Sequence, residues 1–146
     1  MKFEKLKLEN QLCFPVYAAS RLIIREYQPH LDKLGITYPQ YLVLMVLWET
    51  DHISVKEISQ KLILNTNTVT PLLKRMETQD IIKRQRSEND ERKVIIELTK
   101  KGKQMQSSAA RIPEELAATL IAGPLKIEDL VDLKNTLNTI ITFLQK

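Results

Sequence analysis

The feature that most constrains the fold is a change of hydrophobic period near residue 80. Within residues 66–78 the apolar positions fall at i, i+3, i+4 and i+7, the pattern of one helix face: Val69, Leu72, Leu73 and Met76. The next two runs, 81–86 and 93–98, are short and have the composition of strands. A polar loop, 87–92, separates them. The pattern therefore predicts a helix that is followed directly by a β-hairpin.

The segment before this helix predicts a second, shorter helix. Ser54 and Glu57 fit the capping-box pattern that starts such a helix. A brief turn follows, in which Asn65 is a favourable N-cap for the helix over 66–78. Two helices joined by a tight turn, the second with polar and basic groups outward, predict a helix-turn-helix. The basic hairpin that follows is then expected to be a wing.

Helices are also expected on both sides of this unit. An apolar stripe from Leu8 to Tyr27 predicts a helix that Gly35 ends. Residues 38–49 are apolar nearly all round, so they should form a buried central helix.

Beyond the hairpin, Thr99 is expected to cap a further helix that Pro113 kinks. A turn at Gly123-Pro124 then leads into a final helix. The expected fold is mainly α with a small β-hairpin wing: a winged helix-turn-helix over about 38–98, with dimerisation helices over about 6–34 and 99–145. A symmetric homodimer is the simplest use of these end helices, and the alternative is that they cover their own chain's core.

Length and composition limit the class of protein. A chain of 146 residues suggests one domain, 1–146, and the single cysteine excludes an intramolecular disulfide and any multi-cysteine zinc site. No metal or cofactor site is expected. The longest apolar run, Tyr41–Trp48, is too short to span a bilayer, and the first residues lack the apolar run of a signal peptide. A cytoplasmic protein without a membrane partner is expected.

The positive charge lies in the middle third of the chain. Residues 54–103 hold twelve Lys/Arg against seven Asp/Glu, whereas residues 1–53 are balanced. Such a local excess indicates either a nucleic-acid interface or a solvated basic surface. The candidate contacts on the second helix of the motif are Thr66, Asn67, Thr68, Thr70, Pro71, Lys74 and Arg75. On the hairpin, Lys83, Arg84 and Arg86 are either DNA-backbone contacts or solvated strand residues.

Two runs of the sequence resemble a known family. They are LENQLCFPVYAASRLIIREYQPHLDKLGITYPQYLVLMVLWE and TPLLKRMETQDIIKRQRSENDERKVIIELTKKG, and the first contains the QLCF and TYPQYLVL motifs. Over about residues 8–103 the chain resembles the organic-hydroperoxide-sensing branch of the MarR family, which comprises OhrR-like, MgrA-related repressors. The resemblance implies a dimeric winged-helix repressor on pseudo-palindromic double-stranded DNA. It also implies that Arg92 enters the minor groove, oriented by Asp90.

The same resemblance implies that Cys13 is a peroxide-reactive thiol of the one-cysteine type. Tyr17, Tyr27 and Tyr38 match family tyrosines that line the thiol site, the latter two coming from the dimer partner. Two positions depart from the family pattern. Pro15 follows the cysteine where many members carry Ala or Ser, and Asn65-Thr66-Asn67 replaces an Asp-Ser-Gly-like run, so the base preference cannot be transferred.

Without the family, a lone cysteine is most often a small buried hydrophobe. All four tyrosines fall within the first 41 residues, however, and phenol O–H groups can stabilise a thiolate by hydrogen bonding. The chemistry expected is oxidation of Cys13 by an organic hydroperoxide to sulfenic acid, followed by a mixed disulfide with a low-molecular-weight thiol or by overoxidation.

The sequence-based hypothesis is a repressor that senses organic hydroperoxides through Cys13 and then releases DNA. One alternative is a MarR-type repressor released by a small phenolic or apolar ligand, with Cys13 structural. A thiol peroxidase is less favoured because the chain has no second cysteine to resolve the sulfenic acid, so the chain is not expected to be an enzyme. A purely structural interaction protein is opposed by the predicted wing and basic helix.

Overall fold

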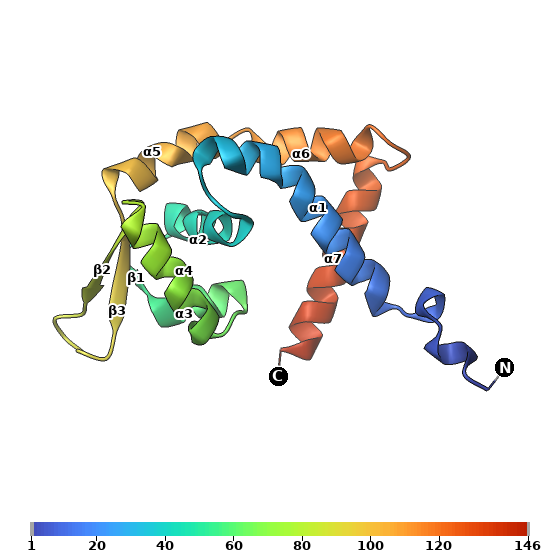
Figure 1. The fold of residues 1–146 in the computed structure, drawn as a ribbon, viewed down its shortest axis with the longest axis horizontal. Coiled ribbons are helices and arrows are strands. Elements are labelled where there is room, and N and C mark those ends of the chain that lie inside the picture. Colours follow the sequence, from blue (N-terminus) through green and yellow to red (C-terminus); the bar gives the residue numbers. More distant parts are fainter. Residues whose placement is uncertain (1, 146) are drawn as a thin grey trace. The chain divides into compact units, whose positions relative to one another are not determined.

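The computed structural model describes residues 2–145, which divide into two compact units on either side of the Ala110–Arg111 bond (Figure 1). The first unit begins with two short 3-10 helices, Glu4–Leu6 and Leu8–Asn10. It continues with α1 (Cys13–Leu34), α2 (Tyr38–Glu49), β1 (Ile53–Ser54), α3 (Val55–Leu62), α4 (Thr66–Thr78), β2 (Ile82–Arg86), β3 (Val94–Leu98) and α5 (Lys100–Ala109). The second unit consists of α6 (Ile112–Ile121) and α7 (Ile127–Leu144).

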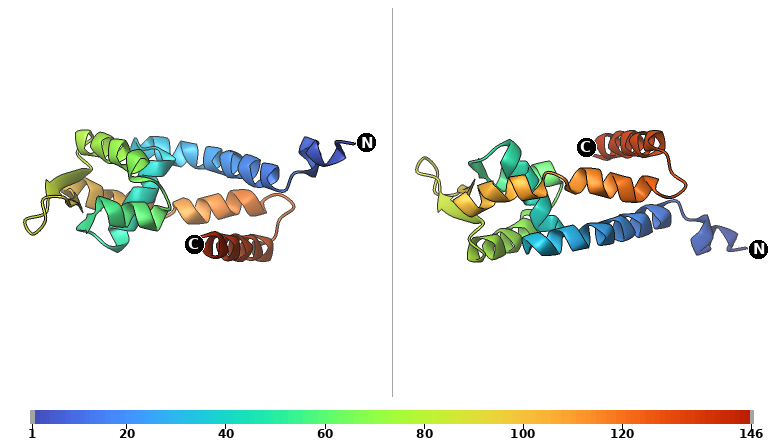
Figure 2. Two further views of the ribbon diagram at one scale, coloured as in Figure 1. Left: turned by 90° about the horizontal axis from the view of Figure 1, so that it is seen from below. Right: turned by 90° about the horizontal axis from the view of Figure 1, so that it is seen from above.

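The three strands form one antiparallel sheet in the order β1-β3-β2. Ile82 pairs with Leu98 and Arg86 with Val94, so β2 and β3 are the predicted hairpin, which extends beyond the helices of its unit (Figure 2). Ile53 of β1 pairs with Ile96 on the other side of β3. The sequence did not predict β1, because two residues are too few to show a period. The helix-turn-helix with its wing confirms the expected fold class.

Helices α2, α3 and α4 begin at residues whose side chains cap them. Thr37 and Gln40 form a complete capping box at the start of α2. The Ser54 hydroxyl accepts the backbone N–H of Glu57 at the start of α3, and Asn65 caps α4. Gly35 ends α1 with a left-handed φ of 69°, which a residue without a Cβ adopts at no steric cost.

The core of the first unit is built around α2, which contacts α1, α3, α4 and α5. Val43, Leu44 and Leu47 of this helix are at most 1% exposed, so the prediction of a buried central helix is confirmed. From α4 the same core receives the four apolar residues that define its inner face: Val69, Leu72, Leu73 and Met76.

The first helix starts later than predicted. The stripe beginning at Leu8 suggested a helix from about residue 6, but α1 begins at Cys13, and the residues before it form 3-10 turns. Gln11 Nε2 donates to the backbone oxygens of Lys5 and Lys7, and Asn10 Nδ2 donates to the backbone oxygen of Glu4. These side chains satisfy carbonyl groups that a helix would need, so the turns compete with helix formation.

Pro113 separates two helices, whereas the sequence predicted that it kinks a single helix. Helix α5 ends at Ala109 and α6 begins at Ile112 with Pro113 in its first turn. Proline has no N–H and clashes with the preceding turn inside a helix, but fits the first turn, where no N–H is required.

The second unit is dominated by exposed apolar side chains. No described residue of α7 is buried. Its large apolar residues that are exposed are Ile127, Val131, Leu133, Ile140, Ile141, Phe143 and Leu144. In the first unit, α1 also exposes four large hydrophobic side chains: Phe14, Val16, Tyr17 and Leu22. Within residues 2–145, no helix is both long enough and apolar enough to cross a bilayer.

Candidate nucleic-acid interface and thiol site

Helix α4 presents a polar and basic surface opposite its buried face. Asn65 Oδ1 accepts the backbone N–H of Asn67 at 2.8 Å, which fixes the first turn. Thr70 is half-buried, and the other candidate contacts on this helix are exposed: Thr66, Asn67, Thr68, Pro71, Lys74 and Arg75. The helix therefore has the outward groups of a recognition helix.

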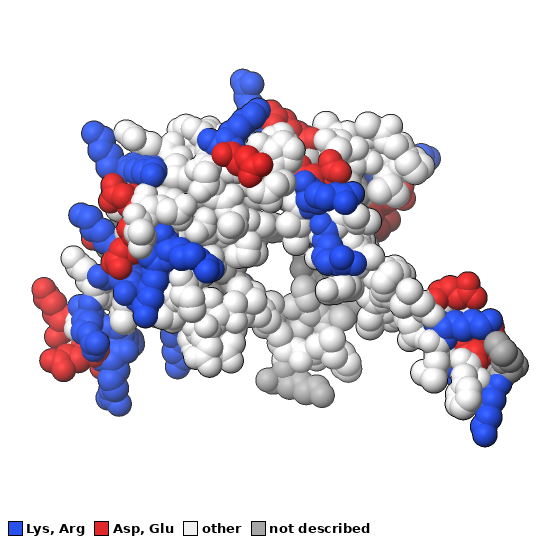
Figure 3. Space-filling view, in the orientation of Figure 1, with Lys and Arg blue, Asp and Glu red and all other residues white. Residues whose placement is uncertain are grey.

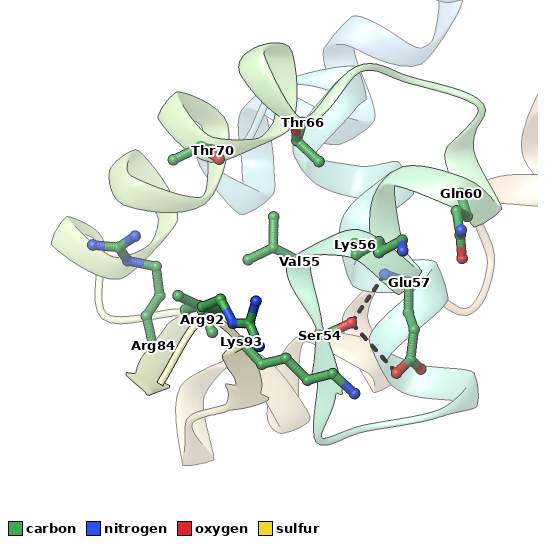
Figure 4. A pocket seen from close by; sticks show the side chains of 11 residues that line it. Ser54, Val55, Lys56, Glu57, Gln60, Thr66, Thr70, Arg84, Arg92 and Lys93 are labelled. Atoms are coloured by element: carbon green, nitrogen blue, oxygen red, sulfur yellow. Dashed lines mark hydrogen bonds between the residues drawn. The ribbon is translucent and has the colours of Figure 1, made fainter. Parts of the chain in front are cut away.

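A cavity of about 520 Å³ opens between α3, α4 and the hairpin (Figure 4). Its lining residues are Ser54, Val55, Lys56, Glu57, Gln60, Thr66, Thr70, Arg84, Arg92, Lys93 and Val94. Four of them are cations and one is an anion, so the cavity is suited to a negatively charged partner. Lys and Arg side chains also gather over the hairpin side of this unit (Figure 3).

The structure brings together only some of the predicted DNA contacts. Thr66, Thr70, Arg84 and Arg92 line the cavity, whereas Arg75 lines a separate hollow of about 420 Å³ beside Gly35 and Gln79. Lys56 and Lys93 were missed by the sequence analysis, which considered α4, the hairpin strands, Asp90 and Arg92. The signal for Lys93 was its place directly after Arg92.

The wing tip holds an exposed arginine that is paired with an aspartate. The Arg92 side chain is 94% exposed, its Nε lies 3.5 Å from Asp90 Oδ1, and its backbone N–H donates to the same oxygen at 3.0 Å. Arg86 Nη1 donates to the backbone oxygen of Glu91 at 3.1 Å, which helps to shape the loop. In this geometry Asp90 can orient Arg92 while the guanidinium stays available to a partner.

Cys13 is exposed and is the first residue of α1. Tyr17 follows one helical turn later, with its ring 4.6 Å from the Arg21 guanidinium carbon. Tyr27 lies fourteen residues beyond Cys13 on the same helix, a distance of about 21 Å at 1.5 Å per residue. Within one chain, therefore, Tyr17 is near the thiol and Tyr27 is not.

Tyr27, Tyr38 and Tyr41 form an aromatic cluster between α1 and α2. The Tyr27 ring lies 4.9 Å from that of Tyr38 and 5.9 Å from that of Tyr41. Burial, with the neighbouring Tyr38 and Tyr41, raises the pKa of Tyr27 to about 12. Burial also raises the pKa values of Tyr38 and Tyr41. All three phenols therefore keep their protons at neutral pH and remain hydrogen-bond donors.

The cluster continues to α5 through the single tryptophan. The Trp48 ring lies 6.5 Å from that of Tyr41, and its Nε1–H donates to the backbone oxygen of Gly102 at 2.9 Å. Tyr41 was not among the predicted site residues, although its spacing of three from Tyr38 on one helix was a usable signal. Among the described residues, no group of His, Cys, Asp and Glu could hold a metal ion.

The chain is similar to known regulators over nearly its whole length. A family described as transcriptional regulator SarA/Rot matches residues 25–108. The chain is 48% identical over 145 residues to the organic hydroperoxide resistance transcriptional regulator of Bacillus subtilis strain 168, covering 99% of this chain and 97% of that protein. It is 40% identical over 135 residues to the regulator MgrA of Staphylococcus aureus, covering 92% and 90%.

One solved relative has been captured in several redox states. Reduced AbfR bound to DNA superposes with a TM-score of 0.78 at 37% identity, covering all of both chains. Overoxidized AbfR bound to DNA gives 0.72 at 39% identity and 96% and 99% coverage. Disulfide-formed AbfR gives 0.64 at 40% identity and 97% coverage of each chain. A further AbfR structure is assigned to Staphylococcus epidermidis.

The helix-turn-helix, its basic face and the β-hairpin define a winged-helix transcriptional regulator. The relatives are transcriptional regulators as well. The chain belongs to the MarR-type regulators of the SarA/Rot group, in the branch that includes the organic hydroperoxide resistance regulator.

Proposed function

We propose that this protein is a homodimeric DNA-binding regulator that senses organic hydroperoxides through Cys13 and releases its DNA when the thiol is modified. The single observation that carries the proposal is the exposed Cys13 at the start of α1, in a chain 48% identical over 99% of its length to an organic hydroperoxide resistance regulator. Repression is the expected mode, and the cytoplasm, where DNA is accessible, is the expected location.

We propose that α4 and the wing contact different parts of the DNA. The polar groups near the start of α4 are proposed to read base edges in the major groove: Thr66, Asn67, Thr68 and Thr70. Pro71 is exposed on the same surface and is proposed to contact DNA there, while Lys74, Arg75 and Arg86 contact phosphates. Arg92 enters the minor groove from the wing tip, where it senses groove width.

Dimerisation is proposed to use the helices outside the winged core, over about 6–34 and 99–145, with the core itself over about 38–98. The exposed apolar residues of α1 and α7 support this division, because a monomer would leave them in water. A two-fold dimer would place two recognition helices on a pseudo-palindromic site, about one helical turn of DNA, or ~34 Å, apart.

The proposed dimer also completes the thiol site. As the family resemblance implies, Tyr17 comes from the same chain as Cys13, while Tyr27 and Tyr38 come from the partner. In its own chain Tyr27 lies about 21 Å along α1 from Cys13, and Tyr38 packs against Tyr27. Protonated phenols beside the sulfur would donate hydrogen bonds to the thiolate.

The proposed chemistry consists of two steps. The Cys13 thiolate attacks the O–O bond of an organic hydroperoxide, takes one oxygen to become sulfenic acid, and releases an alkoxide that is protonated to the alcohol. A low-molecular-weight thiol then displaces the hydroxyl group, which gives a mixed disulfide and water. The chain holds no second cysteine for this step. Each subunit consumes one peroxide without turnover, so the protein is a sensor rather than an enzyme.

Release of DNA is attributed to the bulk of the added group in the dimer body. A displacement of a few ångströms between the two recognition helices breaks their register with successive major grooves. AbfR has been solved on DNA in its overoxidized form, so added oxygen atoms alone are compatible with DNA binding in that relative. The mixed disulfide is therefore the modification proposed to release DNA here.

A gel-shift experiment tests the proposal directly. The reduced protein selects a duplex from a random-sequence library, and its binding to the enriched duplex is measured again after cumene hydroperoxide plus a small thiol, and then after dithiothreitol. Binding that is lost and then restored is expected, and Cys13→Ser is expected to bind without responding. A Cys13→Ser variant that releases DNA as readily as wild type contradicts redox sensing. Release by phenolic ligands alone indicates the ligand-controlled alternative.

A further inference from the structure

One carboxylate at the end of the recognition helix holds the wing at two points. Glu77 Oε1 accepts Arg84 Nε–H at 3.2 Å, and Glu77 Oε2 accepts the backbone N–H of Arg84 at 3.2 Å. Glu77 lies in the last turn of α4, and Arg84 is the middle residue of β2. A single side chain therefore joins the recognition helix to both the side chain and the main chain of the wing.

The position of β2 explains why the main-chain bond matters. The sheet order is β1-β3-β2, so β2 is an edge strand. In an antiparallel ladder every second residue of an edge strand points its N–H away from the partner strand. At Arg84 this outward N–H is bound by Glu77, which fixes the free edge of the wing against α4.

We propose that Glu77 and Arg84 are positioning residues that set the angle of the wing, and that Arg84 does not itself bind a DNA phosphate. The inference rests on the proposed function, because it concerns how the same DNA-binding face is arranged. It gives Arg84 a role different from the backbone contact that the sequence suggested. The Arg84 side chain is 24% exposed and already paired, whereas Arg92 at the tip is 94% exposed.

Two attachments along the strand are needed to define the angle. At the base of the wing, the Thr99 hydroxyl lies within hydrogen-bonding distance of the backbone oxygens of Asp80 and Ile81, at 2.7 and 3.0 Å. The Glu77–Arg84 pair is the second attachment. Arg86 pairs with Val94, so Arg92 lies about four strand residues, or ~13 Å, beyond Arg84 along the hairpin. A rotation of about 10° at Arg84 would displace Arg92 by about 2 Å, well beyond the tolerance of a hydrogen bond.

A double-mutant cycle distinguishes positioning from direct contact. Affinity for a mixed-sequence duplex is measured by fluorescence anisotropy at several KCl concentrations for Arg84→Met, Arg92→Met and the double variant. Positioning predicts that Arg84→Met weakens binding and that the double variant binds like Arg92→Met alone, because both act through the wing tip. Direct contact predicts that the two losses multiply. Lys74→Met in the same Arg92→Met background is the control, and its loss should be additive.

Two further variants test the sign of the effect. Glu77→Ala removes a negative charge from a DNA-binding surface, so electrostatics alone predicts tighter binding. The proposal predicts weaker binding, since Arg84 loses both of its hydrogen bonds to Glu77. Glu88→Ala in the wing loop is the charge-matched control and should bind as well as wild type or better. Arg84→Lys keeps the charge but not the planar guanidinium, so it should bind DNA about as weakly as Arg84→Met. Tighter binding by Glu77→Ala or full rescue by Arg84→Lys overturns the proposal.

Amide hydrogen exchange provides a readout that needs no DNA. The Arg84 amide should be protected in wild type and should exchange faster in Glu77→Ala, with unchanged circular dichroism showing that the fold persists. An Arg84 amide that is equally protected in both proteins contradicts the inference. If wild type binds no duplex at all, the proposed function fails, and the exchange experiment still decides whether Glu77 holds the wing.

Discussion

Replacing Gly102 by alanine is expected to destabilise the protein, although alanine is the better helix former. Gly102 is buried in the first turn of α5, where its N–H donates to the Thr99 hydroxyl. An added Cβ would overlap Ile81 O and lie 3.0 Å from Leu98 Cδ2. Ile81 O is a main-chain atom that already accepts the Thr99 backbone N–H at 3.0 Å, so it cannot move without breaking that bond.

The magnitude follows from opposing contributions. At a solvent-exposed helix position the substitution would raise the free energy of unfolding by about 1 kcal/mol, because alanine has the higher helix propensity. Overpacking against a fixed neighbour costs about 1–3 kcal/mol. Disturbing the hydrogen bond from Trp48 to Gly102 O or those at Ile81 O costs a further ~1 kcal/mol each. The net expectation is a loss of about 1–4 kcal/mol in the free energy of unfolding.

Thermal unfolding followed by circular dichroism measures this difference. All proteins are compared at one concentration, because subunit association contributes to apparent stability. The expected fall in Tm is roughly 3–12 °C. Gly123→Ala is the matched control, since the nearest atom to its added Cβ is Leu120 O at 4.0 Å and its stability should stay within about 0.5 kcal/mol of wild type. A Gly102→Ala protein as stable as wild type would refute the packing argument.

Three other predictions concern the base of the wing, its tip and the tyrosine cluster. Thr99→Val removes the cap of α5 and the hydroxyl that bonds the α4–β2 turn, so urea denaturation should show a loss of about 1–2 kcal/mol. Arg92→Ala should weaken duplex binding at physiological salt without changing Tm, because the side chain is 94% exposed, and unchanged affinity would remove it from the DNA site. Tyr27 ionises near pH 12 in the folded protein but near 10 when unfolded, so the stability it contributes below pH 10 is lost as pH rises towards 12. Tm should therefore fall across this range, and by less in Tyr27→Phe; equal falls in the two proteins would contradict this assignment.

The boundaries of the helices were predictable because their signals are local. Ser54, Asn65 and Thr99 cap helices through side-chain bonds to residues two or three positions ahead, as the sequence indicated, and Thr37 caps α2 in the same way. The end of α1 at Gly35 is equally local, since it depends on the left-handed φ that glycine adopts freely. The predicted start of α1 was wrong, because the side-chain amides of Asn10 and Gln11 donate to backbone oxygens six residues earlier in the chain. The hydrophobic period does not reveal such bonds.

The candidate site was predictable as a list of residues but not as an arrangement. The sequence placed Arg75, Arg84 and Arg92 together as DNA contacts, yet they differ in environment: Arg75 lines another hollow, Arg84 is bound by Glu77, and Arg92 is 94% exposed beside Asp90. Charge is a property of composition, whereas the availability of a charge depends on which partner the fold brings beside it.

The sequence by itself determined the order of the helix-turn-helix and the hairpin strands, the buried face of α4 and the position of the only thiol. Hydrophobic period and capping act within a few residues, so they can be read along the chain. Tertiary structure alone decided the pairing of β1 with β3, the bond from Trp48 to Gly102 and the attachment of the wing by Glu77. These contacts join residues whose mutual approach depends on how the whole core packs, because a hydrogen bond forms only within about 3 Å, and no pattern along the chain encodes that distance.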